Sequence, residues 1–196
     1  MPPRTILFYG RSGCGKGTQA GLLAERLGES GGAVLMVETG KLFREFMERK
    51  NFTSSLTKAL LAKGGLLPEF LPVWIWTQII IDRFSGAEHL VLDGLARRSA
   101  ESEVLDGALR FYERLPADIV MINVSREWSF TRLKGRGRYD DTDADINRRL
   151  DWYEEIVVPA VAFFRNKPGY RFHEINGEQA IEAVEREITE ALALGA

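Results

Sequence analysis

The chain has 196 residues, enough for one compact α/β domain that buries a full core without disulfides or structural metals. Its 26 basic and 28 acidic residues give a formal net charge of -2, so there is no bulk electrostatic reason to expect a nucleic acid or a membrane surface as partner. Cys14 is the only cysteine and His89 and His173 are the only histidines, so neither an intramolecular disulfide nor a zinc site is expected.

Apolar runs in the sequence are short. The run at residues 71–81 is shorter than a membrane span and is followed at once by charged residues, and the run at 5–9 is too short for a signal peptide. No heptad seam or long apolar stripe suggests self-association. We therefore expect a cytoplasmic protein that acts as a monomer.

Short β-branched runs alternate with longer helical stretches, which predicts a parallel sheet covered by helices. Strands are expected at residues 5–9, 33–37, 89–92, 118–124 and 170–175. Helices are expected at residues 16–27, 40–49, 53–62, 69–83, 100–114, 126–133, 143–165 and 177–194. The helix at 143–165 should be interrupted or bent near Pro159, which has no amide to donate. Residues 1–196 are expected to form a single domain, with a helical subdomain between the second and third strands.

A glycine-rich segment joins the first predicted strand to the first predicted helix. In this setting successive backbone amides converge on phosphate oxygens, and the helix N-terminus adds its partial positive charge. Lys16 would reach the outer phosphates of ATP. Cys14 is expected to fill a small-residue position where its amide matters and its side chain does not. The segment predicts an ATP phosphate-binding loop made of Gly10, Ser12, Gly13, Cys14, Gly15, Lys16, Gly17 and Thr18.

The third predicted strand is wholly apolar and ends at Asp93. An aspartate in this position is what a Walker-B element needs to hold the hydration shell of Mg²⁺. We therefore expect Asp93 to contact Mg²⁺ through water, with Thr18 beside the ion and the ion arriving with ATP.

Several segments resemble the adenylate kinases, in the right order and over nearly the whole chain. They lie at residues 15–19, 39–44, 65–69, 90–97 and 132–141. They read Gly-Lys-Gly-Thr-Gln, Thr-Gly-Lys-Leu-Phe-Arg, Gly-Leu-Leu-Pro-Glu, Leu-Val-Leu-Asp-Gly-Leu-Ala-Arg and Arg-Leu-Lys-Gly-Arg-Gly-Arg-Tyr-Asp-Asp. The chain departs from the family pattern at Lys41, in place of aspartate, and at Leu95 and Ala96, in place of Phe-Pro.

The resemblance implies the P-loop NTPase fold, with a five-stranded parallel sheet flanked by helices. It also implies a helical monophosphate-binding segment at residues 39–68 and a very short lid at 132–141. The implied reaction moves the γ-phosphoryl group of Mg-ATP to AMP, so ATP and a nucleoside monophosphate would be the partners.

The resemblance also implies roles for single residues. Arg132 would stack on the donor base and, with Arg136, contact ATP. Asp140 and Asp141 would hold the arginines of the lid in place. The residues implied for acceptor binding are Thr39, Gly40, Arg44, Leu67, Gly94, Arg97, Glu101, Arg138 and Arg149. The implied catalytic set is Lys16, Arg97, Arg132, Arg136, Arg138 and Arg149, with Arg148 a weaker candidate. Guanidinium groups suit this chemistry because they are always charged and bind phosphate oxygens in pairs.

Glu101 leaves the acceptor base open. It takes the place of a family glutamine that reads adenine. An ionised glutamate only accepts hydrogen bonds, so it opposes the lone pair on adenine N1 and suits the N–H groups of guanine. In one interpretation Glu101 contacts the base and favours GMP. In the other it is a solvated residue in the first turn of a helix, and AMP is the acceptor.

Other classes of protein also carry a phosphate-binding loop. A nucleotide-binding switch without transferase activity would not need arginines at positions 44, 97, 132, 136, 138 and 149. A small-molecule kinase acting on a hydroxyl would need a base, and no histidine is well placed for that role. An inactive relative would not be expected to keep Lys16 together with the arginines.

Overall fold

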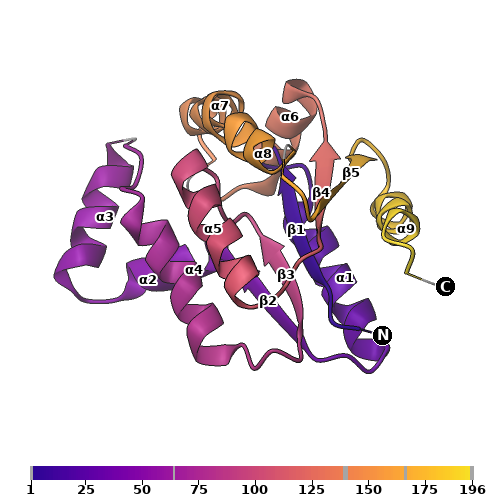
Figure 1. Ribbon diagram of the computed structural model, residues 1–196. Helices are drawn as coiled ribbons and strands as arrows, with labels where there is room; N and C mark the ends of the chain where they lie inside the picture. Colours follow the sequence, from indigo (N-terminus) through magenta and orange to yellow (C-terminus); the bar gives the residue numbers. More distant parts are fainter. Residues whose placement is uncertain (1, 64, 139–140, 166, 195–196) are drawn as a thin grey trace.

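In the computed structural model, which describes residues 2–63, 65–138, 141–165 and 167–194, five parallel strands form the central sheet (Figure 1). The strands are β1 (Thr5–Gly10), β2 (Val34–Glu38), β3 (His89–Asp93), β4 (Ala117–Asn123) and β5 (Tyr170–Asn176). Their order is β2-β3-β1-β4-β5, and every neighbouring pair is parallel. The predicted strands and the predicted sheet are confirmed.

Helices cover both faces of the sheet (Figure 1). On one face lie α1 (Lys16–Glu29) and α9 (Ile181–Ala191); on the other lie α4 (Phe70–Arg83), α5 (Ser99–Phe111) and α8 (Val158–Arg165). The helices α2 (Thr39–Glu48) and α3 (Phe52–Ala62) extend beyond the sheet beside α4, while α6 (Arg126–Arg136) and α7 (Asp143–Trp152) lie near the carboxyl ends of the strands. No helix that the structure describes is long and apolar enough to span a bilayer.

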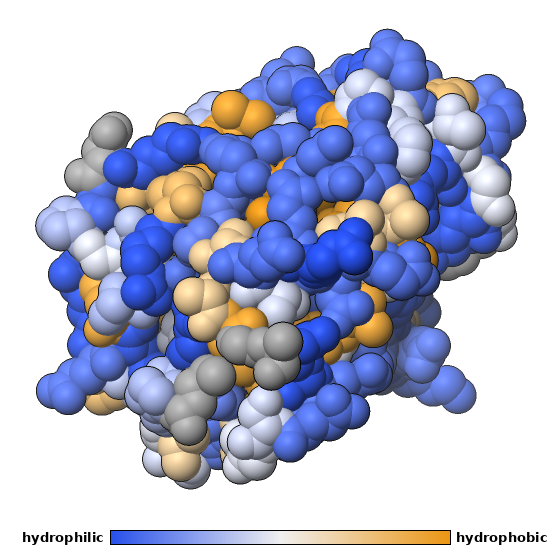
Figure 2. All heavy atoms as spheres, turned by 90° about the vertical axis from the view of Figure 1, so that its right-hand side faces the viewer, coloured by the Kyte–Doolittle hydropathy of each residue, from blue (hydrophilic) through white to orange (hydrophobic). Residues whose placement is uncertain are grey.

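The hydrophobic core has two parts, one on each face of the sheet. Side chains of β1 contribute to them in turn, because successive side chains of a strand point to opposite faces. Ile6 and Phe8 pack with α1 and α9, whereas Leu7 and Tyr9 pack with α4, α5 and α8. All four side chains are at most 2% exposed. The outer surface on the α1 and α9 side is mostly hydrophilic, with apolar side chains scattered over it (Figure 2).

The predicted helix at 143–165 is interrupted, as expected. A π-helical turn, η1 (Tyr153–Val157), separates α7 from α8, and Pro159 is the second residue of α8. Pro159 has no amide to continue the α-helical ladder, and the wider turn lies directly before it.

Several predicted helix ends differ from the structure: α5 ends at Phe111 and not at 114, α6 at Arg136 and not at 133, and α9 at Ala191 and not at 194. The last helix begins at Ile181 and not at 177: the Gly177 amide still bonds the Asn123 carbonyl at 2.8 Å beside β4, and the backbone of Ala180 is extended, with a ψ of 150°. The helix predicted from residue 40 begins one residue earlier, at Thr39, and Glu38 precedes it without a capping side-chain bond. The hydroxyl of Thr39 is buried without a hydrogen-bond partner among the described residues.

Asp118 organises the amino-terminal edge of the sheet. Its carboxylate is 1% exposed and accepts hydrogen bonds from Arg4 at 2.8 Å and from Arg171 at 2.8 and 2.9 Å. The Nε2 atom of His173 lies 2.9 Å from the same carboxylate. One buried carboxylate thus joins the chain segment before β1 to β4 and β5.

Replacing Asp118 with asparagine should lower the free energy of unfolding by about 2–3 kcal/mol at neutral pH, because the cations lose a buried charged partner. Burial raises the pKa of Asp118, but hydrogen bonds from His173, Arg4 and Arg171 outweigh it and hold the pKa below its ordinary value. The stabilisation is therefore present above an unfolded pKa of about 3.9 and lost as the pH falls towards the folded value. Urea unfolding at a series of pH values measures both effects.

The control for this prediction is Asp151→Asn. Asp151 is 53% exposed and pairs with Arg126 at 2.8 Å, so its loss should change stability by about 0.5 kcal/mol or less. Equal losses in the two variants would contradict the role given to Asp118.

Candidate active site

Two adjoining cavities lie at the carboxyl ends of the strands. The larger has a volume of about 1490 Å³ and the smaller about 260 Å³, and Lys16, Arg97 and Arg149 line both. They lie where β1 and β3 are neighbours although their connections leave to opposite sides, which is where open parallel sheets bind ligands. Two cavities meeting at three cationic side chains suit two phosphorylated ligands placed end to end.

The phosphate-binding loop is built on glycines at positive φ. Gly10, Gly13 and Gly15 have φ values of 146°, 86° and 98°, where a side chain would be strained. A Cβ on Gly10 would also lie 2.4 Å from the Ile122 carbonyl oxygen, and one on Gly13 would lie 2.9 Å from Leu133. Glycine therefore lets the loop pack directly on β4 and α6 while its amides stay available.

Lys16 begins α1 and folds back over the loop. Its ammonium donates to the carbonyl oxygens of Gly10 at 2.9 Å and Arg11 at 3.0 Å. These contacts keep the charge above the loop, at the boundary of the two cavities.

Asp93 lies at the end of β3, facing the start of α1. It is 8% exposed, and its Oδ1 atom is buried without a hydrogen-bond partner among the described residues. A Cβ on Gly17 would lie 3.4 Å from Asp93 Oδ2, so the glycine leaves the carboxylate accessible from the loop. Burial raises the pKa of Asp93, and the charges of Lys16 and Arg97 oppose that effect. An unpaired carboxylate oxygen beside a phosphate loop fits the water shell of a nucleotide-bound Mg²⁺.

Cys14 differs from the other residues expected in the loop. Its side chain is 5% exposed and belongs to the core between β1 and α1, and its amide bonds the Arg11 carbonyl at 3.2 Å. It lines neither cavity, whereas every other residue expected to bind a ligand lines at least one.

The smaller cavity holds the residues expected for the acceptor base. Thr39, Gly94 and Glu101 line it, together with apolar side chains. Glu101 is 4% exposed, so the interpretation of it as a solvated helix residue is wrong. Its Oε2 atom accepts a hydrogen bond from the Arg97 amide at 2.9 Å. The fixed carboxylate is therefore part of the cavity wall.

The loop after β3 shows the effect of the departure from Phe-Pro. Ala96 has a φ of 50°, in the left-handed region, which costs an alanine about 1–2 kcal/mol. A proline is locked near a φ of about −65° and could not adopt this conformation. The Arg97 side chain folds back so that its Nε donates to the Gly94 carbonyl at 2.9 Å.

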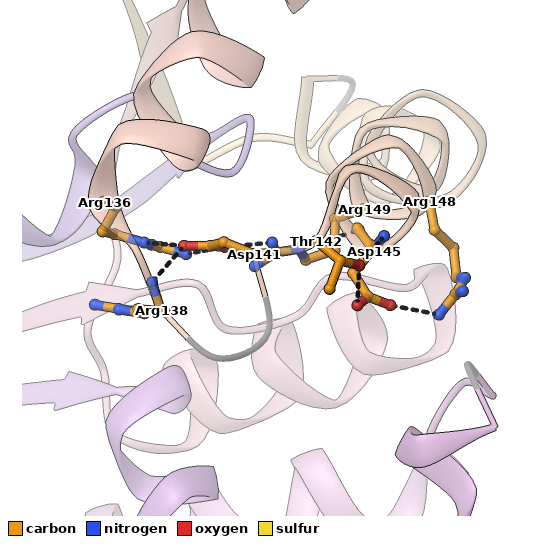
Figure 3. Close-up of polar contacts among 7 residues, drawn as sticks. All are labelled: Arg136, Arg138, Asp141, Thr142, Asp145, Arg148 and Arg149. Atoms are coloured by element: carbon orange, nitrogen blue, oxygen red, sulfur yellow. Dashed lines mark hydrogen bonds and ion pairs between the residues drawn. The ribbon is translucent and has the colours of Figure 1, made fainter.

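Arg136, Arg138 and Arg149, which line the larger cavity, gather around Asp141 (Figure 3). Asp141 is 2% exposed at its side chain and pairs with Arg136 at 2.8 Å and with Arg149 at 2.5 Å. Burial raises the pKa of Asp141, but the hydrogen bonds from these two arginines prevail and lower it to about 2. Arg138 contributes its amide, 3.3 Å from the same carboxylate. Asp140, which was expected to share this task, lies outside the described residues.

The other expected arginines are separate from this cluster. Arg132 on α6 lies over the Trp128 ring with 5.5 Å between guanidinium and centroid, and Arg148 pairs with Asp145 at 3.0 Å. Arg44 on α2 lies 3.3 Å from a carboxylate oxygen of Glu38. All three arginines line the larger cavity, so the fold brings the predicted arginines to one place.

Sequence reasoning overlooked some residues of the cavity walls. Trp152 lines both cavities, and Glu38 and Lys58 line the larger one. Trp152 follows Arg149 by three residues, so a shared helix face was the available signal. Glu38 ends β2, and the carboxyl ends of parallel strands mark the binding edge.

Comparison with known proteins agrees with this geometry. The profile of the adenylate kinase family matches residues 8–168. The adenylate kinases of Mycobacterium tuberculosis (strain H37Rv) and Mycobacterium bovis (strain AF2122/97) are each 34% identical over 168 residues, covering 83% of this chain and 86% of the relative. The adenylate kinase of Mycolicibacterium smegmatis is 33% identical over 165 residues, covering 82% and 86%. The chain is therefore a member of the adenylate kinase family.

Proposed function

We propose that this nucleoside monophosphate kinase transfers the γ-phosphoryl group of Mg-ATP to AMP and forms two molecules of ADP. The observation that carries the proposal is the meeting of a large and a small cavity at Lys16, Arg97 and Arg149. ATP would occupy the larger cavity along the phosphate loop, and the acceptor base would enter the smaller one.

In the proposed mechanism an oxygen of the AMP phosphate attacks the γ-phosphorus of ATP in line with the bridging oxygen. A P–O bond forms as the bond to the β–γ bridging oxygen breaks, and ADP leaves. The attacking oxygen is already ionised, so the protein has no proton to remove. Catalysis then consists of positioning the two phosphates and balancing the charge between them.

The cationic side chains divide this work. Lys16 and the loop amides bind the outer phosphates of ATP, Arg44 and Arg97 hold the acceptor phosphate, and Arg132 stacks on the donor base. Arg136, Arg138 and Arg149 surround the group in transfer, and Asp141 keeps two of them in place. Asp93 and Thr18 would hold Mg²⁺, which supplies charge neutralisation on the phosphates when bound.

The proposal covers the organisation of the chain as well. Residues 1–196 would form one kinase domain, with 39–68 as the monophosphate-binding segment and 132–141 as a short lid. The protein would act as a cytoplasmic monomer without a nucleic-acid, membrane or zinc partner.

A coupled phosphotransfer assay with Mg-ATP and each of AMP, GMP, CMP, UMP and dTMP tests the proposal. Turnover with AMP well above the other four supports it. Activity with none of the five would contradict the proposal and leave nucleotide binding without phosphoryl transfer as the alternative.

The position of Glu101 favours GMP as a second acceptor. One carboxylate oxygen is held by the Arg97 amide, and the structure gives the other no hydrogen-bond partner among the described residues. Burial raises the pKa of Glu101, opposed by that amide and by the charges of Arg98 and Arg97, while Glu69 adds to the rise. An ionised Glu101 would accept from guanine N1–H, whereas a protonated one could donate to adenine N1 as a glutamine does.

Replacing Glu101 with glutamine should therefore raise the ratio of kcat/KM for AMP to that for GMP by about 10-fold, the effect of re-pairing one buried polar group. In the unmodified protein this ratio should rise as the pH falls, because the fraction of protonated Glu101 grows; the variant should show a flat ratio. Kinetics with both acceptors at a series of pH values measure both effects.

Glu103→Gln serves as the control, since Glu103 is exposed on the same helix and lines neither cavity. It should leave the ratio unchanged. An unchanged ratio in the Glu101 variant as well would remove Glu101 from base recognition.

A further inference from the structure

Arg11 belongs to the phosphate loop but lines neither cavity. Its side chain turns away from the ligand region and contacts η1 and Val124, the residue after β4. Nη1 donates to the Val124 carbonyl at 2.5 Å, Nη2 pairs with the Glu154 carboxylate, and the guanidinium carbon lies 4.8 Å from the centroid of the Tyr153 ring. The side chain is 21% exposed, so this contact is partly shielded from water.

The main chain of Arg11 serves the catalytic loop. Its carbonyl accepts from the Lys16 ammonium at 3.0 Å and from the Cys14 amide at 3.2 Å. The residue that orients Lys16 through its backbone is thus attached through its side chain to a different part of the fold.

The other end of this contact leads to Arg149. The Tyr153 amide bonds the carbonyl of Arg149, four residues earlier, and Tyr153 is 6% exposed and lines the smaller cavity. η1 is a π-helical turn, a rare form that often occurs at functional sites. The guanidinium of Arg11 therefore rests on the turn that follows the helix carrying Arg149.

We propose that Arg11 is a positioning residue that couples the phosphate loop to η1 and so sets the placement of Lys16 relative to Arg149. The role rests on the proposed function, in which Lys16 binds the outer phosphates of ATP and Arg149 contacts the group in transfer. An error of about 1 Å in such an arrangement can cost about 100-fold in rate. The contact also joins the donor loop to the wall of the acceptor cavity, so it should couple the binding of the two substrates.

The chain offers a matched control in Arg165. Its guanidinium lies 4.5 Å from the centroid of the Phe172 ring and pairs with the Glu174 carboxylate, and it lines neither cavity. Arg165→Ala therefore removes the same kinds of contact as Arg11→Ala, away from the site.

Steady-state kinetics and thermal unfolding of the two variants test the proposal. Arg11→Ala should lower kcat by about 10- to 30-fold and raise the KM for AMP by only about fivefold, because positioning acts on the transition state and the lost coupling acts on binding. Arg165→Ala should change kcat by less than about twofold, because the ion pair that it removes is exposed and away from the site. It should lower Tm by about as much as Arg11→Ala does. Equal losses of kcat in the two variants, or a loss confined to KM, would overturn the proposal.

Glu154→Gln provides a milder variant, since Glu154 is 49% exposed and its replacement should not disturb folding. It should lower kcat by a few-fold, and the double variant Arg11→Ala/Glu154→Gln should be no slower than Arg11→Ala alone, because both act through one contact. Independent effects that multiply would contradict the coupling.

Binding without turnover separates this proposal from the proposed function. Calorimetric titration with AMP, in the absence and presence of a non-hydrolysable ATP analogue, measures how far one ligand favours the other. In the unmodified protein, the ATP analogue should raise the affinity for AMP by about fivefold or more. Arg11→Ala should lose this gain, and Arg165→Ala should keep it. If the unmodified protein binds both ligands but transfers no phosphoryl group, the proposed reaction fails, while the comparison of the variants still decides the coupling. Equal gains in all three proteins would overturn it.

Discussion

Replacing Lys16 with methionine is expected to lower kcat by about 1,000-fold, the upper range for loss of a preorganised group that stabilises transition-state charge. Methionine keeps most of the length of the side chain and removes the ammonium. The two backbone carbonyls that hold Lys16, at 2.9 and 3.0 Å, fix the charge where the larger and smaller cavities meet. No other side chain on the loop can take its place, because the remaining positions are glycine or carry no cation directed into the cavities.

Initial rates with saturating Mg-ATP and AMP measure this effect, and circular dichroism checks the fold. Lys50→Met is the control, since Lys50 is exposed and lines neither cavity, and it should retain the activity of the unmodified protein. A loss below about 10-fold in the Lys16 variant would be too small for a phosphate-neutralising cation and would remove Lys16 from the mechanism.

Replacing Arg149 with methionine is expected to lower kcat by about 100- to 1,000-fold, whereas Arg148→Met should cost about 10-fold or less. The two arginines are adjacent in sequence but differ in surroundings. Arg149 lines both cavities and shares Asp141 with Arg136, while Arg148 lines the larger cavity alone and pairs with Asp145. Of these two arginines, only Arg149 lines both cavities, and it alone of the pair would lie between the proposed donor and acceptor.

Single-turnover rates of the two variants give the comparison free of product release. Loss of Arg149 also leaves the buried Asp141 with one cation fewer, so part of the effect could arise from a displaced Arg136. Asp141→Asn separates the contributions: it keeps both arginines, and it should fall between the unmodified protein and Arg149→Met. Equal rates for Arg148→Met and Arg149→Met would contradict the assignment.

The fold class and the phosphate loop could be predicted because they depend on short stretches of chain. Alternating and β-branched runs specify the five strands, and Pro159 interrupts its helix through its own missing amide. The loop is specified in the same way, because Gly10, Gly13 and Gly15 adopt backbone angles that disfavour other residues.

The surroundings of single side chains could not be predicted, because they depend on which distant segments pack together. The sequence left two interpretations of Glu101 open, and only the packing of α5 beside the cavity makes it a buried carboxylate. The Gly177 amide looks available to start a helix, yet it bonds a carbonyl at the end of β4.

By itself, then, the sequence determined the strands, the phosphate loop and the supply of arginines, since backbone preferences and side-chain chemistry are local properties. The tertiary structure alone decided how these parts meet: Asp141 between two arginines, Asp118 beside Arg4, Arg171 and His173, and Arg11 between the loop and η1. The physical reason is that burial and electrostatic pairing act through space. A carboxylate or guanidinium acquires its role only when folding places particular side chains beside it and shields them from water.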